Sequence, residues 1–229
     1  MTLQHERLPD ALPAEPLELL QRWLGEAVEA GLTPNPSAMV LATVDGHGAP
    51  DARVVLCKEL RPQPGYATFF TNYQSRKADE LAGNPRAAAV FHWDALHRQA
   101  RLEGRVTRTT AAESDTYFAS RHWQSRLGAW ASQQSQPIGS REQLEQSLEQ
   151  LARRFEAPSP LQADPTAPDP GIRIARPPHW GGYRLWIAAV ELWVEGAARL
   201  HDRARWRREL QPAAAGFTAG PWQATRLQP

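Results

Sequence analysis

Apolar residues first recur at helical spacing and then gather in short runs that are typical of strands. From Leu17 to Val28 they repeat every three or four positions, and Gly31 follows where a helix commonly ends, so an amphipathic helix is predicted. Apolar runs at 37–44 and 52–58 flank the turn sequence Asp-Gly-His-Gly, and this pattern predicts a β-hairpin.

Further strands and helices follow along the chain. Two capping-box sequences predict helices at 110–120 and 140–155, and a serine N-cap predicts a short helix at 75–81. Alternating, β-branched or aromatic residues predict the remaining strands, at 66–71, 86–93, 97–106, 182–194, 199–209 and 222–227. This series of short strands with interspersed helices indicates a mainly β protein, a small antiparallel barrel with helical cover.

Two proline-containing segments interrupt this pattern. Residues 1–16 are polar with three prolines and are expected to form a mobile N-terminal arm. Residues 157–178 contain seven prolines and few large apolar groups, which predicts a loop. Because strands resume after that loop, we interpret 17–229 as a single domain with an inserted loop.

Composition narrows the class of protein. The 26 basic residues nearly balance 25 acidic ones, and a net charge of +1 argues against a nucleic-acid coat. A hydrophobic share of 41% predicts a packed core. A single cysteine, no signal-peptide pattern and no apolar run of about 18 residues predict a cytoplasmic protein without a membrane segment.

Cations occur at two places where an anion could bind. Arg53 and Lys58 share a strand that looks buried, so each should have an anionic partner, either a ligand or a nearby acid such as Glu59. Arg76 and Lys77 open a predicted helix, where cations and the helix dipole together favour a phosphate, although such sequences also occur on solvated helix starts. Only Lys58 and Lys77 are lysines, against 24 arginines.

Two further strings have residue types suited to binding an anionic ring. Tyr117 and Arg121 are four positions apart, so they would share one face of a helix, and Ser125 follows four positions later. This pattern suits a second anion clamp, or an exposed tyrosine ring stacked on the arginine. In an extended chain Arg199, His201 and Arg203 would point to one side, where they could bind a phosphate or phenolate; a charged edge strand is the alternative. No metal-ligand spacing, serine-hydrolase string or glycine-rich nucleotide loop is present.

Taken in order, ten short strings resemble the pyridoxamine 5′-phosphate oxidase family from Leu17 to Pro229. They are SAMVLATVDGHG, RVVLCK, FFTNYQSRKADEL, RQARLEGR, YFASR, GAWASQQS, WGGYRL, ELWVEG, RLHDR and the terminal RLQP. The resemblance implies the FMN-binding split β-barrel fold, with FMN as cofactor and a homodimer that shares its sites. Departures are the N-terminal arm, which lacks the Arg- and Tyr-bearing segment of many members, Asn35-Pro36 in place of an acid before the proline, and the long 157–178 loop.

The resemblance also implies roles for individual residues. FMN would be bound by Arg53, Val54, Val55, Leu56, Cys57, Lys58, Phe70, Thr71, Arg76, Lys77, Gln99, Gln134, Ser135, Trp193 and Arg203. The substrate phosphate would be held by Lys58, Tyr117, Arg121 and Ser125, and the substrate ring by Arg199 and His201, which are the expected catalytic residues. No metal is implied.

The implied reaction is oxidation of pyridoxamine or pyridoxine 5′-phosphate to pyridoxal 5′-phosphate. A hydride would pass from C4′ to FMN, and O2 would accept the electrons to give H2O2. Two alternatives remain open: a related split-barrel flavin oxidase acting on another ring, such as a phenazine precursor, and a non-catalytic protein that binds FMN or pyridoxal phosphate.

Overall fold

The computed structural model describes residues 7–164 and 168–229 and divides into two compact units. Unit 1 contains the described residues up to Phe69, together with Glu80–Thr107 and Tyr183–Pro229. Unit 2 contains Phe70–Asp79 and Arg108–Gly182. The prediction of a single domain over 17–229 stays a prediction, and each unit is described by itself.

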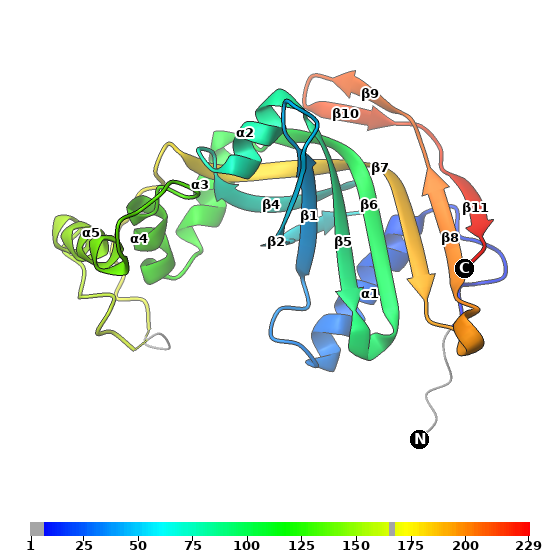
Figure 1. Cartoon of the computed structure of the whole chain (residues 1–229), viewed down its shortest axis with the longest axis horizontal. Helices are drawn as coiled ribbons and strands as arrows, with labels where there is room; N and C mark the ends of the chain where they lie inside the picture. Colours follow the sequence, from blue (N-terminus) through cyan, green and yellow to red (C-terminus); the bar gives the residue numbers. More distant parts are fainter. Residues whose placement is uncertain (1–6, 165–167) are drawn as a thin grey trace. The chain divides into compact units, whose positions relative to one another are not determined.

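A curled nine-stranded sheet forms most of unit 1 (Figure 1). Seven strands lie in the order β11-β8-β7-β6-β5-β1-β2, and β4 joins this sheet through β7 and carries β3 at its other edge. The bounds are β1 Ala38–Val44, β2 Pro50–Leu56, β3 Glu59–Arg61, β4 Tyr66–Asn72, β5 Arg86–Trp93, β6 Arg98–Arg108, β7 Trp180–Val194, β8 Asp202–Arg207 and β11 Gln223–Leu227. A separate hairpin joins β9 Leu210–Ala213 to β10 Gly216–Ala219.

The predicted fold class is confirmed, since this is a mainly β, split-barrel type of sheet with peripheral helices. β1 and β2 pair antiparallel as the predicted hairpin, with Val40 opposite Val54. α1 Pro16–Ala30 begins with proline and ends at Gly31, whose φ of 61° lies in the left-handed region. It buries Leu17, Leu20 and Trp23, and no helix in the described ranges is long and apolar enough to cross a membrane.

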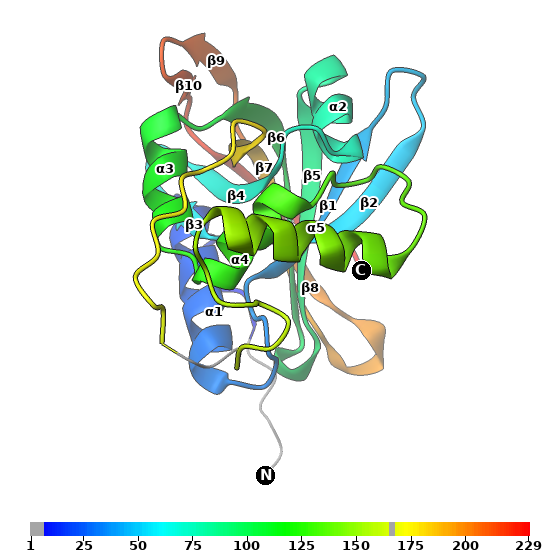
Figure 2. The same ribbon diagram turned by 90° about the vertical axis from the view of Figure 1, so that its left-hand side faces the viewer.

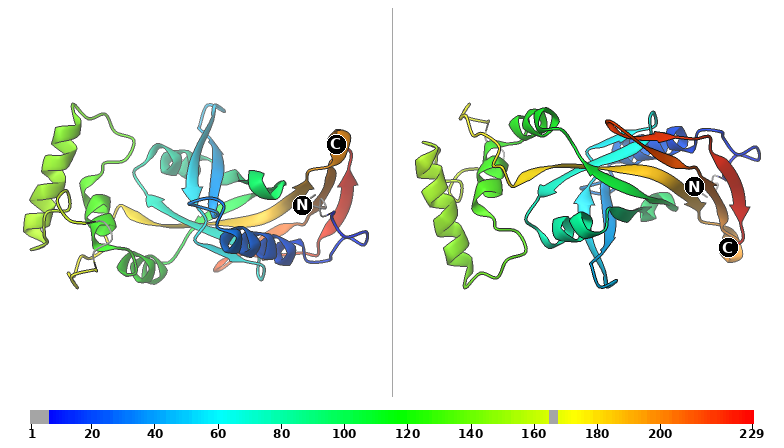
Figure 3. Two further views of the ribbon diagram at one scale, coloured as in Figure 1. Left: turned by 90° about the horizontal axis from the view of Figure 1, so that it is seen from below. Right: turned by 90° about the horizontal axis from the view of Figure 1, so that it is seen from above.

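The described part of the N-terminal segment, residues 7–15, is held against β8 and β11 (Figure 3). Leu8 is buried and its backbone N–H donates to Asp202 at 2.8 Å. The Trp206 indole donates to the carbonyl of Pro13 at 2.9 Å. In place of the expected mobile arm, this stretch is anchored, because its few apolar and backbone groups find partners far along the chain. Residues 1–6 lie outside the described residues.

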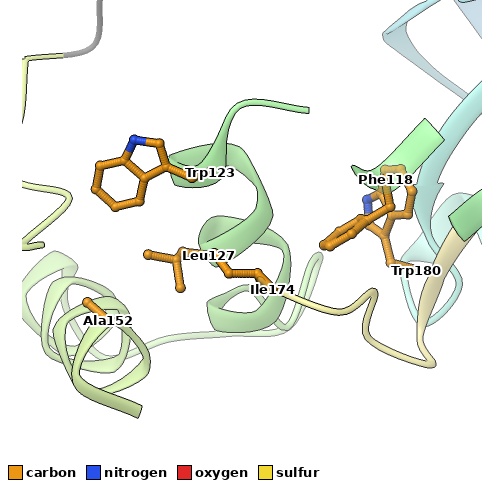
Figure 4. Packing of buried hydrophobic residues seen from close by; sticks show 6 residues of the cluster. All are labelled: Phe118, Trp123, Leu127, Ala152, Ile174 and Trp180. Atoms are coloured by element: carbon orange, nitrogen blue, oxygen red, sulfur yellow. The ribbon is translucent and has the colours of Figure 1, made fainter. Parts of the chain in front are cut away.

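Helices α3 Ala111–Ala119, α4 Trp123–Ala131 and α5 Arg141–Arg154 form most of unit 2, with α4 and α5 side by side (Figure 2). The Thr110–Glu113 capping box is confirmed, with both reciprocal hydrogen bonds formed. The Ser140 hydroxyl accepts from the Gln143 N–H, as expected for an N-cap. Buried apolar residues of α3, α4, α5, the following segment and the start of β7 pack into one cluster, shown in Figure 4: Phe118, Trp123, Leu127, Ala152, Ile174 and Trp180.

Several elements differ from the sequence prediction. Neither α4 nor the β9–β10 hairpin was predicted, because α4 is short and has no capping side chain, and the hairpin is largely exposed. The strand predicted at 199–209 begins at Asp202, after the short 3-10 helix η2 Ala197–Arg199. The other short elements are α2 Arg76–Gly83, as expected after Ser75, and the 3-10 helix η1 Asp94–Leu96.

Candidate functional site

A buried ammonium group marks the start of α2 in unit 2. Lys77 is 8% exposed, and its Nζ donates to three neutral oxygens: Gln134 Oε1 at 2.7 Å, Thr71 Oγ1 at 3.1 Å and Ser75 Oγ at 3.2 Å. Arg76 is exposed one residue earlier. A cation, hydroxyl groups and a helix start thus meet at one place, a donor set suited to a phosphate.

Local hydrogen bonds hold this arrangement. After β4 ends, the Ser75 hydroxyl donates to the Asn72 carbonyl at 2.7 Å. The Asn72 amide donates to the Ser132 carbonyl at 3.1 Å, which fixes the segment carrying Gln134. Ser135, with a φ of 73°, then turns the chain away. The structure therefore brings the predicted residues Thr71, Lys77 and Gln134 together; Ser75 was not assigned to the site from sequence.

A second cluster in unit 2 combines stacked rings with a half-buried guanidinium. The Phe70 and Tyr117 rings stack with centroids 3.9 Å apart, and Phe70 also stacks on Trp180. The Arg121 Cζ lies 4.7 Å from the Trp180 ring centroid. Burial lowers the pKa of Arg121, partly opposed by Tyr117, but from so high an ordinary value that the group stays charged at neutral pH. The Trp180 contact was not foreseen.

Arg121 has donor capacity left over. Its Nη1 is buried and has no hydrogen-bond partner among the described residues. A buried donor without a partner costs about 1–3 kcal/mol, and more when it is charged. An anion delivered by a ligand would remove that cost, which makes this guanidinium a candidate anion-binding group.

The prediction that Tyr117 and Arg121 share one helical face is wrong. α3 ends at Ala119, so Arg121 lies in the connection to α4 and not on the same helical face as Tyr117. Tyr117 stacks on Phe70, while Arg121 packs on Trp180. The capped helix is too short to carry both residues. Ser125 lies exposed on α4.

In unit 1 the two cations of the RVVLCK string have different surroundings. Arg53 donates to Asp51 at 2.8 Å and to the buried Glu80 at 2.9 Å, so its acidic partners are these and not Glu59. Glu59 instead pairs with Arg61. Lys58 is exposed just beyond the end of β2. Between them Val54 is exposed, Val55 and Leu56 are half-buried and Cys57 is buried.

We expect the Cys57 thiol to be unreactive in the folded protein. Burial raises its pKa to about 12, and its Sγ donates to the Glu59 carbonyl at 3.3 Å. At pH 8 the thiolate fraction is then roughly 1 in 10,000, so iodoacetamide should label the folded chain about 1000-fold more slowly than the urea-unfolded chain. Mass spectrometry of labelled protein measures both rates, and equal rates would contradict the buried position of the thiol.

The RLHDR string is not a continuous strand. Ala198 and Arg199 have φ of 54° and 63°, which is left-handed backbone. The prediction that residues 199, 201 and 203 point to one side of an extended strand is therefore wrong. Gly196 allows this turn, because a Cβ there would lie 1.9 Å from the Leu200 carbonyl oxygen. Left-handed backbone at two successive non-glycine residues costs about 1–3 kcal/mol each, which is a common property of functional segments.

This turn orders the side chains around His201. Its ring lies 4.6 Å from the Trp193 ring, and its Nδ1 accepts from the Gly196 N–H at 3.2 Å. Arg199 is exposed beside it. Arg203 lies on β8 and pairs with the buried Glu191 at 2.7 Å.

Among the other predicted residues, Gln99 lies half-buried on β6 opposite His92. Glu80 and Glu191, which pair with predicted site arginines, were missed. Neither is near its arginine in sequence, so no local signal pointed to them.

Comparisons with known proteins give a consistent picture. The family profile "Pyridoxamine 5'-phosphate oxidase" matches residues 24–154, and "Pyridoxine 5'-phosphate oxidase C-terminal dimerisation region" matches residues 180–229. The pyridoxine/pyridoxamine 5′-phosphate oxidase of Cupriavidus necator is 47% identical, over 94% of this chain and 89% of its own. The protein of the same name from a Cyanothece species is 46% identical over 93% and 88% of the two chains.

Solved structures agree on the fold. PhzG from Burkholderia lata, in complex with tetrahydrophenazine-1-carboxylic acid, superposes with a TM-score of 0.78 at 28% identity and covers 96% of this chain and 95% of its own. A pyridoxamine 5′-phosphate oxidase-related, FMN-binding protein from Nostoc punctiforme has a TM-score of 0.65 at 18% identity, over 96% and 99% of the two chains. The second likeness shows the fold alone.

Proposed function

Because this chain belongs to the pyridoxamine 5′-phosphate oxidase family, we propose that it oxidises pyridoxamine and pyridoxine 5′-phosphate to pyridoxal 5′-phosphate with FMN as cofactor and O2 as electron acceptor. Relatives of that name match nearly the whole chain at 46–47% identity. The observation in this chain that carries the proposal is the buried, partnerless Nη1 of Arg121 beside stacked rings, which suits a phosphorylated aromatic substrate.

The residues at the start of α2 fit the phosphate of FMN. Lys77 supplies a desolvated ammonium group, and Thr71 and Gln134 hold it in place. Electrostatic attraction is strong in such a setting, about 4 kcal/mol for a unit pair at 4 Å with an effective dielectric of 20. Arg76 would add a second charge at the rim of the site. Of the other assigned residues, Phe70, Gln99, Ser135, Trp193, Arg203 and Arg53 through Lys58 would complete FMN binding.

Substrate binding is assigned to a different set of residues. Arg121 would donate to the substrate phosphate through its unused Nη1, with Tyr117, Ser125 and Lys58 as further donors. A guanidinium suits this task because its planar donors match phosphate oxygens and it keeps its charge even when half-buried.

Arg199 and His201 would act on the substrate ring. The strained turn through Ala198 presents Arg199 to solvent, where its guanidinium can hold an anionic ring oxygen, and the His201 imidazole can form hydrogen bonds to the ring. A tilted ring contact with Trp193 and the hydrogen bond from Gly196 fix the imidazole orientation. Bound flavin supplies the redox chemistry, that is, acceptance of a hydride from C4′. The protein residues orient the substrate and hold its charges.

We also propose that the active form is a homodimer in the cytoplasm. The match of residues 180–229 to a dimerisation region supports the dimer. A lone, buried cysteine is consistent with a reducing compartment.

The assignment predicts that purified protein loaded with FMN will convert pyridoxine 5′-phosphate in air to an aldehyde and H2O2. Pyridoxamine 5′-phosphate should give the same aldehyde with ammonia. Absorbance of the aldehyde and a peroxide-coupled assay measure the two products. A flavin-loaded sample that binds pyridoxal 5′-phosphate without turning over either substrate would be a carrier and would contradict the proposal.

The alternative substrate class is a reduced phenazine, favoured by one observation. PhzG, which was solved with a tetrahydrophenazine carboxylic acid, superposes on this chain with a TM-score of 0.78. Its identity of 28% is well below the 47% of the Cupriavidus oxidase. Side-by-side assays of pyridoxine 5′-phosphate and a dihydrophenazine carboxylate decide between them.

A further inference from the structure

The proline-rich loop is tethered along one helix of unit 2. Three side chains of α4 donate to its backbone: Gln124 Nε2 to the Pro160 carbonyl at 3.1 Å, Arg126 Nη1 to the Ile172 carbonyl at 3.2 Å and Trp130 Nε1 to the Ala175 carbonyl at 2.8 Å. Apolar contact adds to these bonds, since Ile174 of the loop and Leu127 of α4 belong to one buried cluster (Figure 4). The loop therefore contacts α4 at positions from Gln124 to Trp130.

An ion pair forms the polar centre of this contact. The Arg126 Nη2 donates to the Asp169 carboxylate, with the arginine side chain 9% exposed and the aspartate 35% exposed. The Gly171 N–H donates to the other oxygen of Asp169 at 2.9 Å. Desolvation opposes ionisation of Asp169, but Gly171 and Arg126 together keep its pKa below the ordinary value. A buried guanidinium depends on such a partner, because removal of the partner leaves an uncompensated charge inside the protein.

Helix geometry places these loop contacts on the side of α4 opposite Ser125. Each residue of an α-helix turns by about 100°, so Gln124, Arg126, Leu127 and Trp130 fall within about 160° of one another. Ser125 lies roughly 180° from the middle of that group, on the exposed side of α4. The loop thus packs on one face of α4 while Ser125 occupies the other.

The first turn of α4 connects these loop contacts to Arg121 and Ser125. Its N-cap residue, His122, makes no side-chain capping hydrogen bond. Arg121 immediately precedes that N-cap, so any shift of the first turn of α4 moves Arg121 as well as Ser125. The loop contacts at Gln124 and Arg126 fall in this first turn.

We propose that the Arg126–Asp169 ion pair is a positioning element, through which the proline-rich loop sets the first turn of α4 and so the affinity of Arg121 and Ser125 for a phosphate group. This rests on the proposed function for the identity of the substrate. Neither residue of the pair touches the substrate in this proposal; both act through the backbone of α4.

Asp169→Ala tests the pair. We expect the KM for pyridoxine 5′-phosphate to rise about tenfold, since coupled neighbours interact at that scale. The kcat and the FMN content should stay unchanged. The lost interaction binds the substrate equally in the ground state and the transition state, so its loss raises the KM without lowering the kcat. Competitive inhibition by inorganic phosphate should weaken by the same factor, a readout that a loss of general stability would not produce. Steady-state kinetics on FMN-loaded protein give all three values.

Rescue and control variants complete the test. Asp169→Glu keeps the carboxylate and should recover most of the wild-type KM. Arg141→Ala removes an exposed ion pair with Glu145 on α5 and should leave the KM unchanged. A wild-type KM and phosphate inhibition in Asp169→Ala would overturn the proposal, as would a fall in kcat or FMN content equal to the rise in KM.

A separate measurement keeps this inference distinct from the proposed function. Phosphate binding to FMN-loaded wild type and Asp169→Ala can be followed by calorimetry without any turnover. Weaker phosphate binding by the variant supports the positioning role even if the wild type does not oxidise pyridoxine 5′-phosphate. Equal binding overturns it even if the wild type is an active oxidase. If Asp169→Ala does not fold, Asp169→Asn keeps the side-chain shape and serves the same comparison.

Discussion

Replacing both cations at the start of α2, Arg76→Ala with Lys77→Ala, should yield a colourless protein that does not retain FMN. Lys77 is buried against Thr71, Ser75 and Gln134, so its removal deletes the one desolvated charge of this cluster. A hydrogen bond to a charged group contributes about 1.5–3 kcal/mol, and two such losses weaken binding by roughly 100-fold or more. Flavin absorbance per mole of purified protein and titration with added FMN measure the effect.

The matched control for this pair is Arg22→Ala. Arg22 is exposed on α1, where it pairs with Glu26, so its loss should leave the flavin content unchanged. Circular dichroism shows whether the double variant keeps its fold. A folded double variant that binds FMN as tightly as the wild type would contradict the phosphate assignment of this helix start.

Arg199→Ala is expected to lower kcat by roughly 100-fold while the protein remains yellow, because misplacement of the reacting groups has effects of this size. Arg199 is exposed on a strained turn and makes no hydrogen bond or ion pair with a described residue, so its removal should not disturb the fold. FMN content, melting temperature and kcat with pyridoxine 5′-phosphate are measured on the same preparation.

Arg207→Ala is the matched control, since Arg207 is an exposed arginine on the neighbouring strand β8. Its kcat should equal that of the wild type. If Arg199→Ala loses flavin and activity together, or keeps full activity, the role of Arg199 at the substrate ring is wrong.

Signals contained within a few residues led to correct local structure. The Thr110–Glu113 capping box and the glycine after α1 are local hydrogen-bond and backbone requirements, so they could be found without knowing the fold. The β1–β2 hairpin is likewise specified by its turn and its alternation. For Lys77, sequence predicted the charge at a helix start, and the structure added the three oxygens around it.

Errors arose where side chains depend on distant partners or on small backbone changes. Arg53 finds Glu80, 27 positions away, in preference to the nearby Glu59, because the sheet brings the helix-borne carboxylate beside it. The alternation of residues in the RLHDR string predicts a strand, but Ala198 and Arg199 have left-handed backbone angles and turn the chain before β8 begins. Residues 7–15 look unstructured by composition, but their backbone bonds to Asp202 and Arg226 hold them.

Residue order by itself was enough to predict the mainly β fold and its family, because these follow from local periodicity and from ordered short strings. Tertiary structure alone decided which charges are buried and paired. It left the Arg121 Nη1 without a partner beside Trp180 and joined Arg126 to Asp169 across 43 positions. The physical reason is that burial and ion pairing depend on distances in space, which chain folding sets and sequence spacing does not.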